Sequence, residues 1–255
     1  MRNTVLFILL FSTLNIYAQN KLLITYNLHY KPSKDFNKFE DESFYLQIDT
    51  NSKTSIFKSI GQFKADSILN GSAIINLSFF KTNQSRFTNT IFYNYSTKIL
   101  GEDNNFGSQK LKYEIENFKI LWDLVAEQKT INSYKVSKAE CELFGRKWIA
   151  WYTVEIPIQE GPYKFKGLPG LILQISDSKN EYNYNFSGLS KNLDLKIISP
   201  PSKIITHKEF LDAKIKLKNN PYSSIPGFEI LEGNIKKTIE EKFKMKEKLE
   251  NNPIE

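Results

Sequence analysis

Residues 156–172 read IPIQEGPYKFKGLPGLI, and this stretch decides how the chain around it can fold. It contains three of the nine prolines and three of the eleven glycines in the protein. Pro157 and Pro162 cannot donate a ladder hydrogen bond, so a regular strand must leave its sheet near Ile156. The glycines allow backbone angles that other residues resist. The sequence therefore predicts a shaped, rigid loop.

The segments on either side of this loop carry the clearest strand patterns in the chain. Residues 147–156 are rich in aromatic and β-branched side chains that divide between two faces, which is typical of a β-strand. Residues 171–176 are apolar, and after a turn at 177–180 the segment 181–187 alternates aromatic residues with asparagine. This arrangement predicts a β-hairpin. The loop therefore joins two elements of sheet.

The strand at 147–156 has two distinct faces. The face that suits a core carries Trp148, Ala150, Tyr152, Val154 and Ile156. The opposite face places Trp151 beside Glu155, and we expect that face to be wetter or to face a ligand.

Similar patterns extend over the rest of the chain. Strands are predicted at 22–30, 43–48, 55–60, 74–80, 90–96, 112–115 and 138–144. Residues 61–72 suit a short helix, and residues 98–109, which include Gly101 and Gly107, suit a loop. Helices are expected from Thr206 and over about 232–250. The fold class is therefore mainly β (α+β), with a curved antiparallel sheet or half-barrel, a short internal helix and C-terminal helices.

The first eighteen residues have the pattern of a secretory signal peptide. Arg2 precedes an apolar run at 4–14, and Ala18 precedes a polar residue. This run is well short of the roughly 20 residues that a membrane-spanning helix needs. We therefore expect three parts. These are a signal peptide (1–18), an antiparallel β domain carrying the loop (19–202), and a helical segment (203–255) that packs on the sheet or is partly free.

The signal peptide predicts an exported protein, periplasmic or secreted, that does not span the membrane after cleavage. The net charge of +7 comes from lysines interleaved with acidic residues, without the basic stripe that nucleic-acid binding needs. Cys141 is the single cysteine, which excludes an internal disulfide. His29 and His207 are the only histidines and make a poor metal site, so we expect neither metal nor cofactor.

The loop and its flanks admit two structural interpretations. In the first, Tyr163 and Phe165 are exposed on a pre-ordered loop and form a binding rim. In the second, the loop covers the core, and Leu168, Pro169 and Leu171 are buried. For the binding interpretation, the candidate residues are Arg146, Trp151, Glu155, Gly161, Pro162, Tyr163, Phe165, Gly167, Leu168, Pro169 and Gly170.

A third interpretation is catalytic. Glu155, Glu160 and Asp177 lie near the loop in sequence, and two carboxylates about 5–10 Å apart in a cleft could serve an envelope hydrolase. The chain has no Gly-x-Ser-x-Gly elbow and no phosphate-binding Gly-Lys-Ser/Thr sequence. The hydrolase hypothesis therefore rests on the carboxylates alone.

Several short motifs in this region occur together in one known family. They are Gly145-Arg146, Ala150-Trp151-Tyr152, Ile156-Pro157, Gly161-Pro162 and the run FKGLPGLI at 165–172. With these motifs the chain resembles the GLPGLI family of exported Bacteroidota proteins, named for the sequence that stands here at 167–172. The family has no defined catalytic residues.

The resemblance implies a non-enzymatic binding or accessory role in the cell envelope, linked to outer-membrane receptors of the TonB-dependent type. The expected partner is an envelope or outer-membrane protein, or a peptide or lipid-like ligand. By analogy of fold, a half-barrel on an exported protein is similar to the periplasmic lipoprotein carriers, which hold acyl chains in an apolar hollow.

Overall fold

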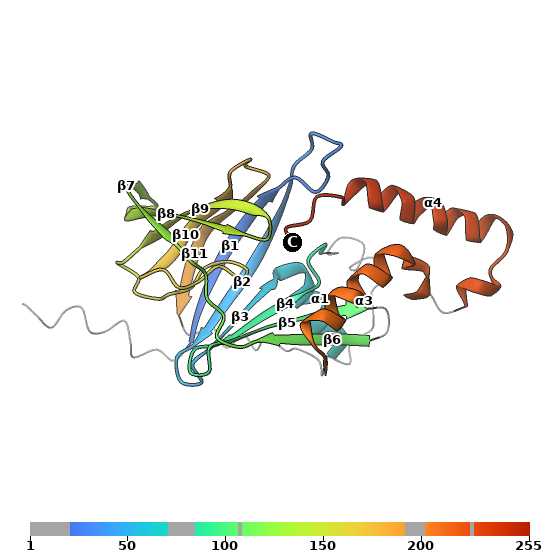
Figure 1. Ribbon diagram of the computed structural model, residues 1–255, viewed down its shortest axis with the longest axis horizontal. Coiled ribbons are helices and arrows are strands. Elements are labelled where there is room, and N and C mark those ends of the chain that lie inside the picture. The colour runs from blue at the N-terminus through green and yellow to red at the C-terminus, as the bar shows by residue number, and fades with distance from the viewer. Residues whose placement is uncertain (1–20, 71–84, 107–108, 192–201, 225–226) are drawn as a thin grey trace, which may run out of the picture.

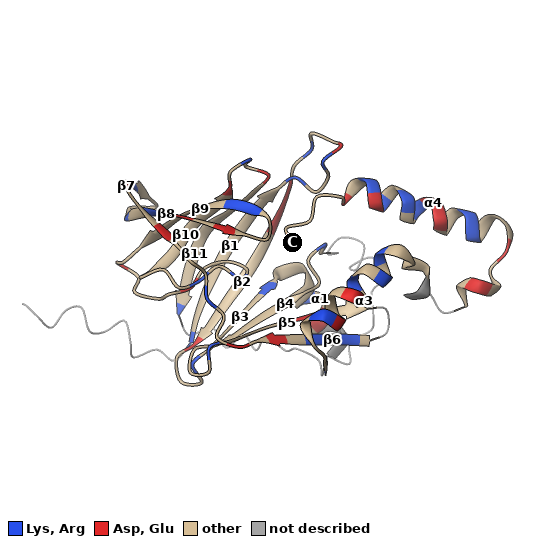
Figure 2. Cartoon of the chain, in the orientation of Figure 1, with Lys and Arg blue, Asp and Glu red and all other residues tan. Residues whose placement is uncertain are grey.

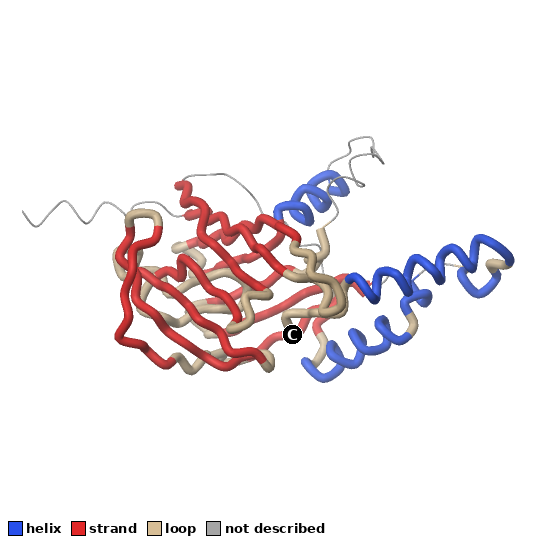
Figure 3. Tube along the Cα trace, turned by 90° about the horizontal axis from the view of Figure 1, so that it is seen from above, coloured by secondary structure: helices blue, strands red, loops and turns tan. Residues whose placement is uncertain are grey.

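The computed structural model shows one curved β-sheet with helices gathered at one end (Figures 1 and 3). The residues that it describes are 21–70, 85–106, 109–191, 202–224 and 227–255. The predicted signal peptide and the predicted strand at 74–80 lie outside these ranges.

Within the described ranges the sheet has twelve strands. They are β1 (Lys21–Tyr30), β2 (Glu40–Asp49), β3 (Thr54–Ser59), β4 (Thr90–Asn94), β5 (Ile99–Phe106), β6 (Gln109–Ile115), β7 (Asp123–Ile131), β8 (Tyr134–Leu143), β9 (Arg146–Thr153), β10 (Leu171–Asp177), β11 (Tyr182–Lys191) and β12 (Lys203–Ile204). The helices are α1 (Ile60–Asn70), α3 (His207–Asn219) and α4 (Gly233–Leu249), with 3₁₀ turns η2 (Pro221–Ser224) and η3 (Phe228–Ile230).

The strand order is β12-β6-β5-β4-β3-β2-β1-β11-β10-β9-β8-β7. Neighbouring strands are antiparallel throughout, except that the short β12 runs parallel to β6. The first strand lies inside the sheet and joins a half made of β2–β6 to a half made of β7–β11. The prediction of a mainly β, curved antiparallel sheet is confirmed, and so is the hairpin of β10 and β11.

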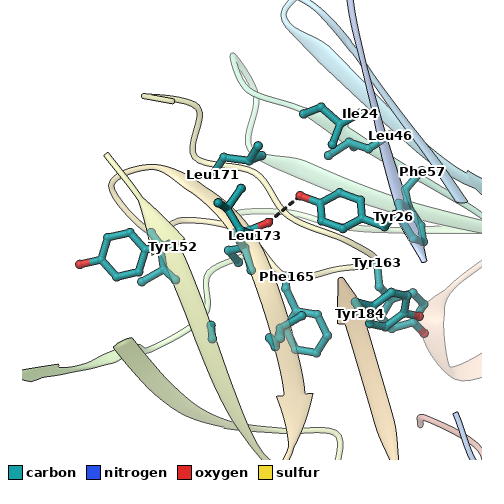
Figure 4. Close-up of a cluster of buried hydrophobic side chains, with 14 of the residues drawn as sticks. Ile24, Tyr26, Leu46, Phe57, Tyr152, Tyr163, Phe165, Leu171, Leu173 and Tyr184 are labelled. Carbon is teal, nitrogen blue, oxygen red and sulfur yellow. Dashed lines mark hydrogen bonds between the residues drawn. The ribbon is translucent and has the colours of Figure 1, made fainter. Parts of the chain in front are cut away.

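Apolar and aromatic side chains from both halves form one core (Figure 4). Phe44 stacks on Phe57 with ring centroids 4.9 Å apart, and both rings contact Tyr184 from the other half. The buried hydroxyl of Tyr26 donates to the carbonyl of Ile172 at 2.7 Å. Because buried polar groups are costly when unpaired, this bond also fixes how β1 faces β10.

The structure corrects two details of the predicted strands. Residues 99–106 form strand β5 in the middle of one half, although 98–109 was predicted to be a loop. Strand β9 ends at Thr153, and Val154 is 63% exposed, so Val154 does not share the core face of Trp148. Pro157 cannot pair, and the chain turns away before it.

Helix α3 begins with the predicted capping box, in which Thr206 and Glu209 each bond to the backbone of the other. Its Phe210 is buried against Tyr113 of β6 and Phe106 of β5. Helix α4 has no buried residue and projects from the sheet (Figure 1). Among the described residues, no helix combines the length and apolar character needed to cross a membrane.

Candidate functional site

The loop between β9 and β10 lies inside the curve of the sheet, because it contacts strands from both halves. Phe165 packs against Trp148 of β9 with ring centroids 4.6 Å apart. On the other side, Ser55 of β3 donates to Glu160 at 3.0 Å. Trp122 donates through Nε1 to the carbonyl of Lys166 at 3.0 Å. The loop therefore fills the interior and connects the two halves.

This position corrects the prediction of a rim of exposed aromatic residues. Tyr163 is buried and Phe165 is 0% exposed, because their rings complete the core. Leu168 and Leu171 are also buried, as the architectural interpretation predicted. Pro169 is exposed, so that interpretation is wrong for this residue.

Two glycines of the loop stand where no side chain fits. A Cβ on Gly170 would lie 1.9 Å from the carbonyl oxygen of Thr153. A Cβ on Gly161 would lie 2.8 Å from the carbonyl oxygen of Phe165, and Pro162 beside it is buried. Gly167 has a φ of +94°, which favours glycine. The glycines therefore allow the loop backbone to pass close to its neighbours.

Replacing Gly170 by alanine should lower the free energy of unfolding by about 3 kcal/mol or more, because the clash is with backbone atoms that cannot rotate away. Urea denaturation gives this value. Gly188→Ala is the matched control, since a Cβ there meets nothing within 4 Å. Equal denaturation midpoints for the two variants would contradict the prediction.

Trp151 and Glu155 do not form the open ligand-facing surface that the sequence suggested. The ring of Trp151 is buried, with Lys129 Nζ 4.0 Å from its centroid, and that ammonium also donates to Gln174 at 2.9 Å. The prediction of a wetter face is wrong for Trp151, because the Lys129 side chain of β7 lies over its ring. Glu155 is exposed and accepts a bond from the backbone of Lys135 at 2.8 Å.

The three carboxylates of the hydrolase hypothesis have different partners. Asp177 pairs with Trp148 near the start of β9, whereas Glu155 follows the end of β9. At about 3.3 Å per residue, the strand from Trp148 to Thr153 alone is roughly 17 Å long. The backbones of Asp177 and Glu155 therefore lie at opposite ends of β9. Glu160 is buried beside Lys166, with the salt bridge at 3.1 Å. None of the three lines either of two cavities in the described part of the chain, which have volumes of about 380 and 230 Å³.

Arg146 is the candidate residue with the most connections. Its Nη1 donates to Asp177 at 2.7 Å and to Glu181 at 3.0 Å. Its Nη2 donates to the side chain of Asn252 at 2.7 Å and to the carbonyl of Pro253 at 3.1 Å. Burial raises the pKa of the Glu181 carboxyl, but hydrogen bonds from Arg146 and Asn252 offset this and leave it below its ordinary value.

Lys164 forms a second charged cluster in the same region. Its ammonium is 1% exposed and contacts Glu102 of β5 at 2.6 Å and the Tyr113 hydroxyl at 3.0 Å. The Tyr113 hydroxyl donates to Glu102 at 2.9 Å. Lys164 and the Tyr163 hydroxyl both contact the carboxylate of Glu255. Each group is therefore paired, which is the condition for burying a charge at moderate cost.

Both clusters converge on residues 251–255, which we call the 251–255 segment. We call Arg146, Tyr163, Lys164, Glu181 and Tyr182 the segment site. A cavity of about 230 Å³ opens beside the segment and is lined by residues of both halves of the sheet. A second cavity, of about 380 Å³, lies over β3–β6 and contains none of the candidate residues.

Two further kinds of reactive site, a metal centre and a nucleophilic thiol, were considered among the described residues. They contain no cluster of three or more His, Cys, Asp or Glu that could hold a metal ion. Cys141 is buried on β8, and burial, with a smaller effect of Asp123, raises the pKa of its thiol to about 12. A thiol with that pKa stays protonated at neutral pH and is a poor nucleophile.

The chain matches one described protein family over this region. Residues 145–174 match a family described as "Protein of unknown function (Porph_ging)". The matched stretch includes Arg146, Tyr163 and Lys164, and thus three residues of the segment site. It is also the stretch from which the resemblance to the GLPGLI family was drawn, but the match does not carry that name. No curated protein matches the chain.

Among solved structures, the chain is similar to PNGF-II. The identity to its P21 crystal form is 16% with a TM-score of 0.55, and to its C2 form 15% with a TM-score of 0.57. In both comparisons the alignment covers 79% of this chain but 34% of PNGF-II. This chain thus spans about a third of the length of PNGF-II, and at this identity the likeness concerns the fold alone.

A putative outer membrane lipoprotein-sorting protein domain from Vibrio parahaemolyticus is also similar, at 9% identity over 69% of this chain and 87% of that domain. Its TM-score is 0.26, and no argument about this chain follows from so low a value. The lipoprotein-carrier analogy therefore rests on the curved sheet itself.

Sequence reasoning found Arg146 and Tyr163 but missed the rest of the segment site. Lys164 lies between Tyr163 and Phe165, and a lysine between two aromatic residues in an apolar loop was the available signal for a buried ion pair. Glu102 gave no such signal, because its strand was predicted to be a loop. The role of the 251–255 segment depends on a contact between residues far apart in the chain.

Proposed function

We propose that this protein is an exported, non-enzymatic accessory protein of the cell envelope that binds an extended peptide segment at the segment site. The observation that carries the proposal is the convergence of two charged clusters, around Arg146 and around Lys164, on the short 251–255 segment. In this arrangement the protein's own segment is the occupant, and the segment of a partner protein exchanges with it.

Both cations of the segment site keep an ion pair when the segment is removed. Arg146 keeps its ion pairs with Asp177 and Glu181, and Lys164 keeps its ion pair with Glu102. The ion pairs hold both cations in place, while Arg146 Nη2, whose two acceptors lie in the segment, becomes available to a ligand, so little reorganisation is needed on binding. This property supports a receptor site, because a contact needed only for folding would leave buried charges unpaired when broken.

The connection to the segment also supports exchange. Helix α4 precedes the segment and buries none of its residues, so it does not hold the segment against the sheet. Near the helix end, Ser33 donates to the carbonyl of Lys248 at 2.6 Å, and Arg86 forms an ion pair with Glu250 at 3.0 Å. At the start of the segment, the Asn251 side chain accepts from the backbone of Lys34 at 2.7 Å and donates to Asp35 at 2.6 Å, so exchange must also break these surface bonds. The segment can therefore leave its site without separating strands of the sheet.

An envelope location fits the surface of the helices. In α3 and α4 lysine outnumbers acidic residues (Figure 2). Helix α3 packs on β5 and β6, and α4 projects from the sheet. A basic helical surface favours contact with anionic envelope surfaces. We place the partner among envelope or outer-membrane proteins, with receptors of the TonB-dependent type as the first candidates. A peptide fits the charged site better than a lipid-like ligand.

The test uses a variant that ends at Glu250 and a fluorescent, amidated peptide with the sequence of residues 248–255. The truncated protein should bind the peptide in fluorescence anisotropy. The affinity of the full chain for the peptide should be at least about tenfold lower, because its own segment competes at a high effective concentration. A peptide with the same residues in scrambled order is the control.

Circular dichroism shows whether the truncated protein is folded. A second variant, Asn252→Ala in the full chain, weakens the attachment of the segment without removing it and should show intermediate peptide binding. A folded truncated protein that does not bind the peptide overturns the proposal. Unfolding of both variants also overturns it, because the segment would then be a part of the core that the fold requires.

A further inference from the structure

The segment site surrounds one asparagine side chain on all of its polar atoms. We infer that the site recognises a partner segment in which asparagine is followed by proline, an aliphatic residue and an acidic residue, the order of residues 252–255. This inference rests on the proposed function, and it specifies the ligand that the site selects.

Asn252 is 1% exposed, and each polar group of this residue has a partner. Its side-chain oxygen accepts from Arg146 at 2.7 Å. Its side-chain nitrogen donates to the carbonyl of Lys31 at 2.7 Å and to Glu181 at 3.3 Å. Its backbone nitrogen donates to the carbonyl of Pro32 at 3.0 Å. Its carbonyl accepts from the Tyr182 hydroxyl.

This set of partners distinguishes asparagine from its nearest relatives. Aspartate would place a carboxylate oxygen where the amide nitrogen stands, next to the Lys31 carbonyl and the Glu181 carboxylate. The Lys31 carbonyl would lose this donor, and Glu181 would keep only its bond from Arg146 while facing a second negative charge. Glutamine is one methylene longer, while the bonds to Pro32 and Tyr182 fix its backbone. The site thus selects a side-chain amide that is separated from the backbone by one methylene group, as in asparagine.

The next three positions have matching environments. Proline carries no N–H, and no donor is needed at Pro253, whose carbonyl accepts from Arg146 at 3.1 Å. Ile254 is buried among apolar core residues. The carboxylate of Glu255 meets Lys164 and the Tyr163 hydroxyl. The ligand is therefore acidic at a position three residues after the asparagine.

The test compares four amidated peptides on the variant that ends at Glu250. One has the sequence of residues 248–255, and the others carry the changes Asn252→Asp, Asn252→Gln and Glu255→Gln. We expect the aspartate and glutamine peptides at position 252 to bind about tenfold to hundredfold more weakly, since each loses bonds to charged groups. The Glu255→Gln peptide should lose about tenfold.

A substitution in the protein tests directly whether Glu181 selects asparagine over aspartate. In the variant Glu181→Gln, the new amide can donate to a carboxylate. The preference for the asparagine peptide over the aspartate peptide should therefore shrink about tenfold. A role in folding alone would change the affinity of both peptides equally and leave their ratio unchanged.

The outcomes separate this inference from the proposed function. If none of the peptides binds, the proposed function fails. If all four bind within twofold of one another, the site binds peptides without reading asparagine, and only the inference fails. Light scattering of the full chain identifies the source of the segment. A monomer supports a different partner protein, and a dimer that exchanges its segments overturns that assignment.

Discussion

Phe165→Ala is expected to lower the free energy of unfolding by about 3–5 kcal/mol. The ring is fully buried and packs against Trp148 and Tyr163, so its removal leaves a cavity between the loop and strand β9. The loop backbone is held by the bond of Ser55 to Glu160 and by the bond of Trp122 to the carbonyl of Lys166, which limits collapse into that cavity. The expected cost therefore lies at the upper end for a core substitution.

Urea denaturation followed by tryptophan fluorescence measures this loss, since Trp148 reports on the same contact. Phe36→Ala is the control, because Phe36 is 44% exposed and its removal should change stability by less than about 0.5 kcal/mol. Similar midpoints for the two variants would show that the loop does not belong to the core. The same result would restore the rim of exposed aromatic residues that the sequence suggested.

Lys164→Met is expected to cost a similar amount, about 3–5 kcal/mol at pH 7. Methionine fills most of the volume of the lysine stem, so the loss is that of the charge. Glu102 and Glu255 would then face each other, buried and without their shared cation. Lys147→Met is the control: Lys147 is half exposed, and its ion pair with Glu140 lies at the surface, where water and salt screen it, so its loss should change stability little.

The effect of this substitution should depend on pH. In the native protein, burial raises the pKa of Glu102, but Lys164 and Lys214 offset this, and the pKa lies below its ordinary value of 4.5. Its stabilisation is therefore complete above pH 4.5 and is lost as the pH falls through the lowered value. Without Lys164, burial dominates and raises the pKa of Glu102, so protonation then relieves the buried charge.

It follows that the deficit of the Lys164→Met variant should shrink as the pH falls from 7 toward 4.5. Denaturation midpoints measured at several pH values, for the variant and the native protein, give this difference. A deficit that stays constant over this range would mean that Glu102 is not the group left unpaired. The Lys147→Met control should show no comparable trend.

The sheet could be predicted from the sequence wherever one face of a strand is apolar and the other polar. The hairpin of β10 and β11 and the capping box of α3 were found in this way, since both depend on neighbouring residues. Strand β5 was missed because its buried side chains include Glu102 and Asp103. They can be buried because Lys164 and Lys110 reach them from other segments, and an alternation pattern contains no information about such partners.

The candidate site was predictable to a smaller degree. Proline and glycine spacing located the loop and indicated its rigidity, but that spacing is the same for a loop that turns outward and one that fills the interior. Arg146 was selected as part of a motif, whereas its partners Asp177, Glu181 and Asn252 meet it only in the folded chain. The contacts of the 251–255 segment with Arg146 and Lys164 join residues far apart in the chain, and the local sequence contains no signal for them.

The central position of β1 has a consequence for the order of folding. Strands β1–β3 can pair as soon as they have been made, but the other edge of β1 waits for β11, and Ser187 reaches Thr25 across 162 residues of chain. Contacts of such long range form slowly, and an unpaired strand edge can join another chain in the meantime. The half-sheet β1–β6 is therefore the species most exposed to aggregation, and the pairing of β11 with β1 is the step that ends this exposure.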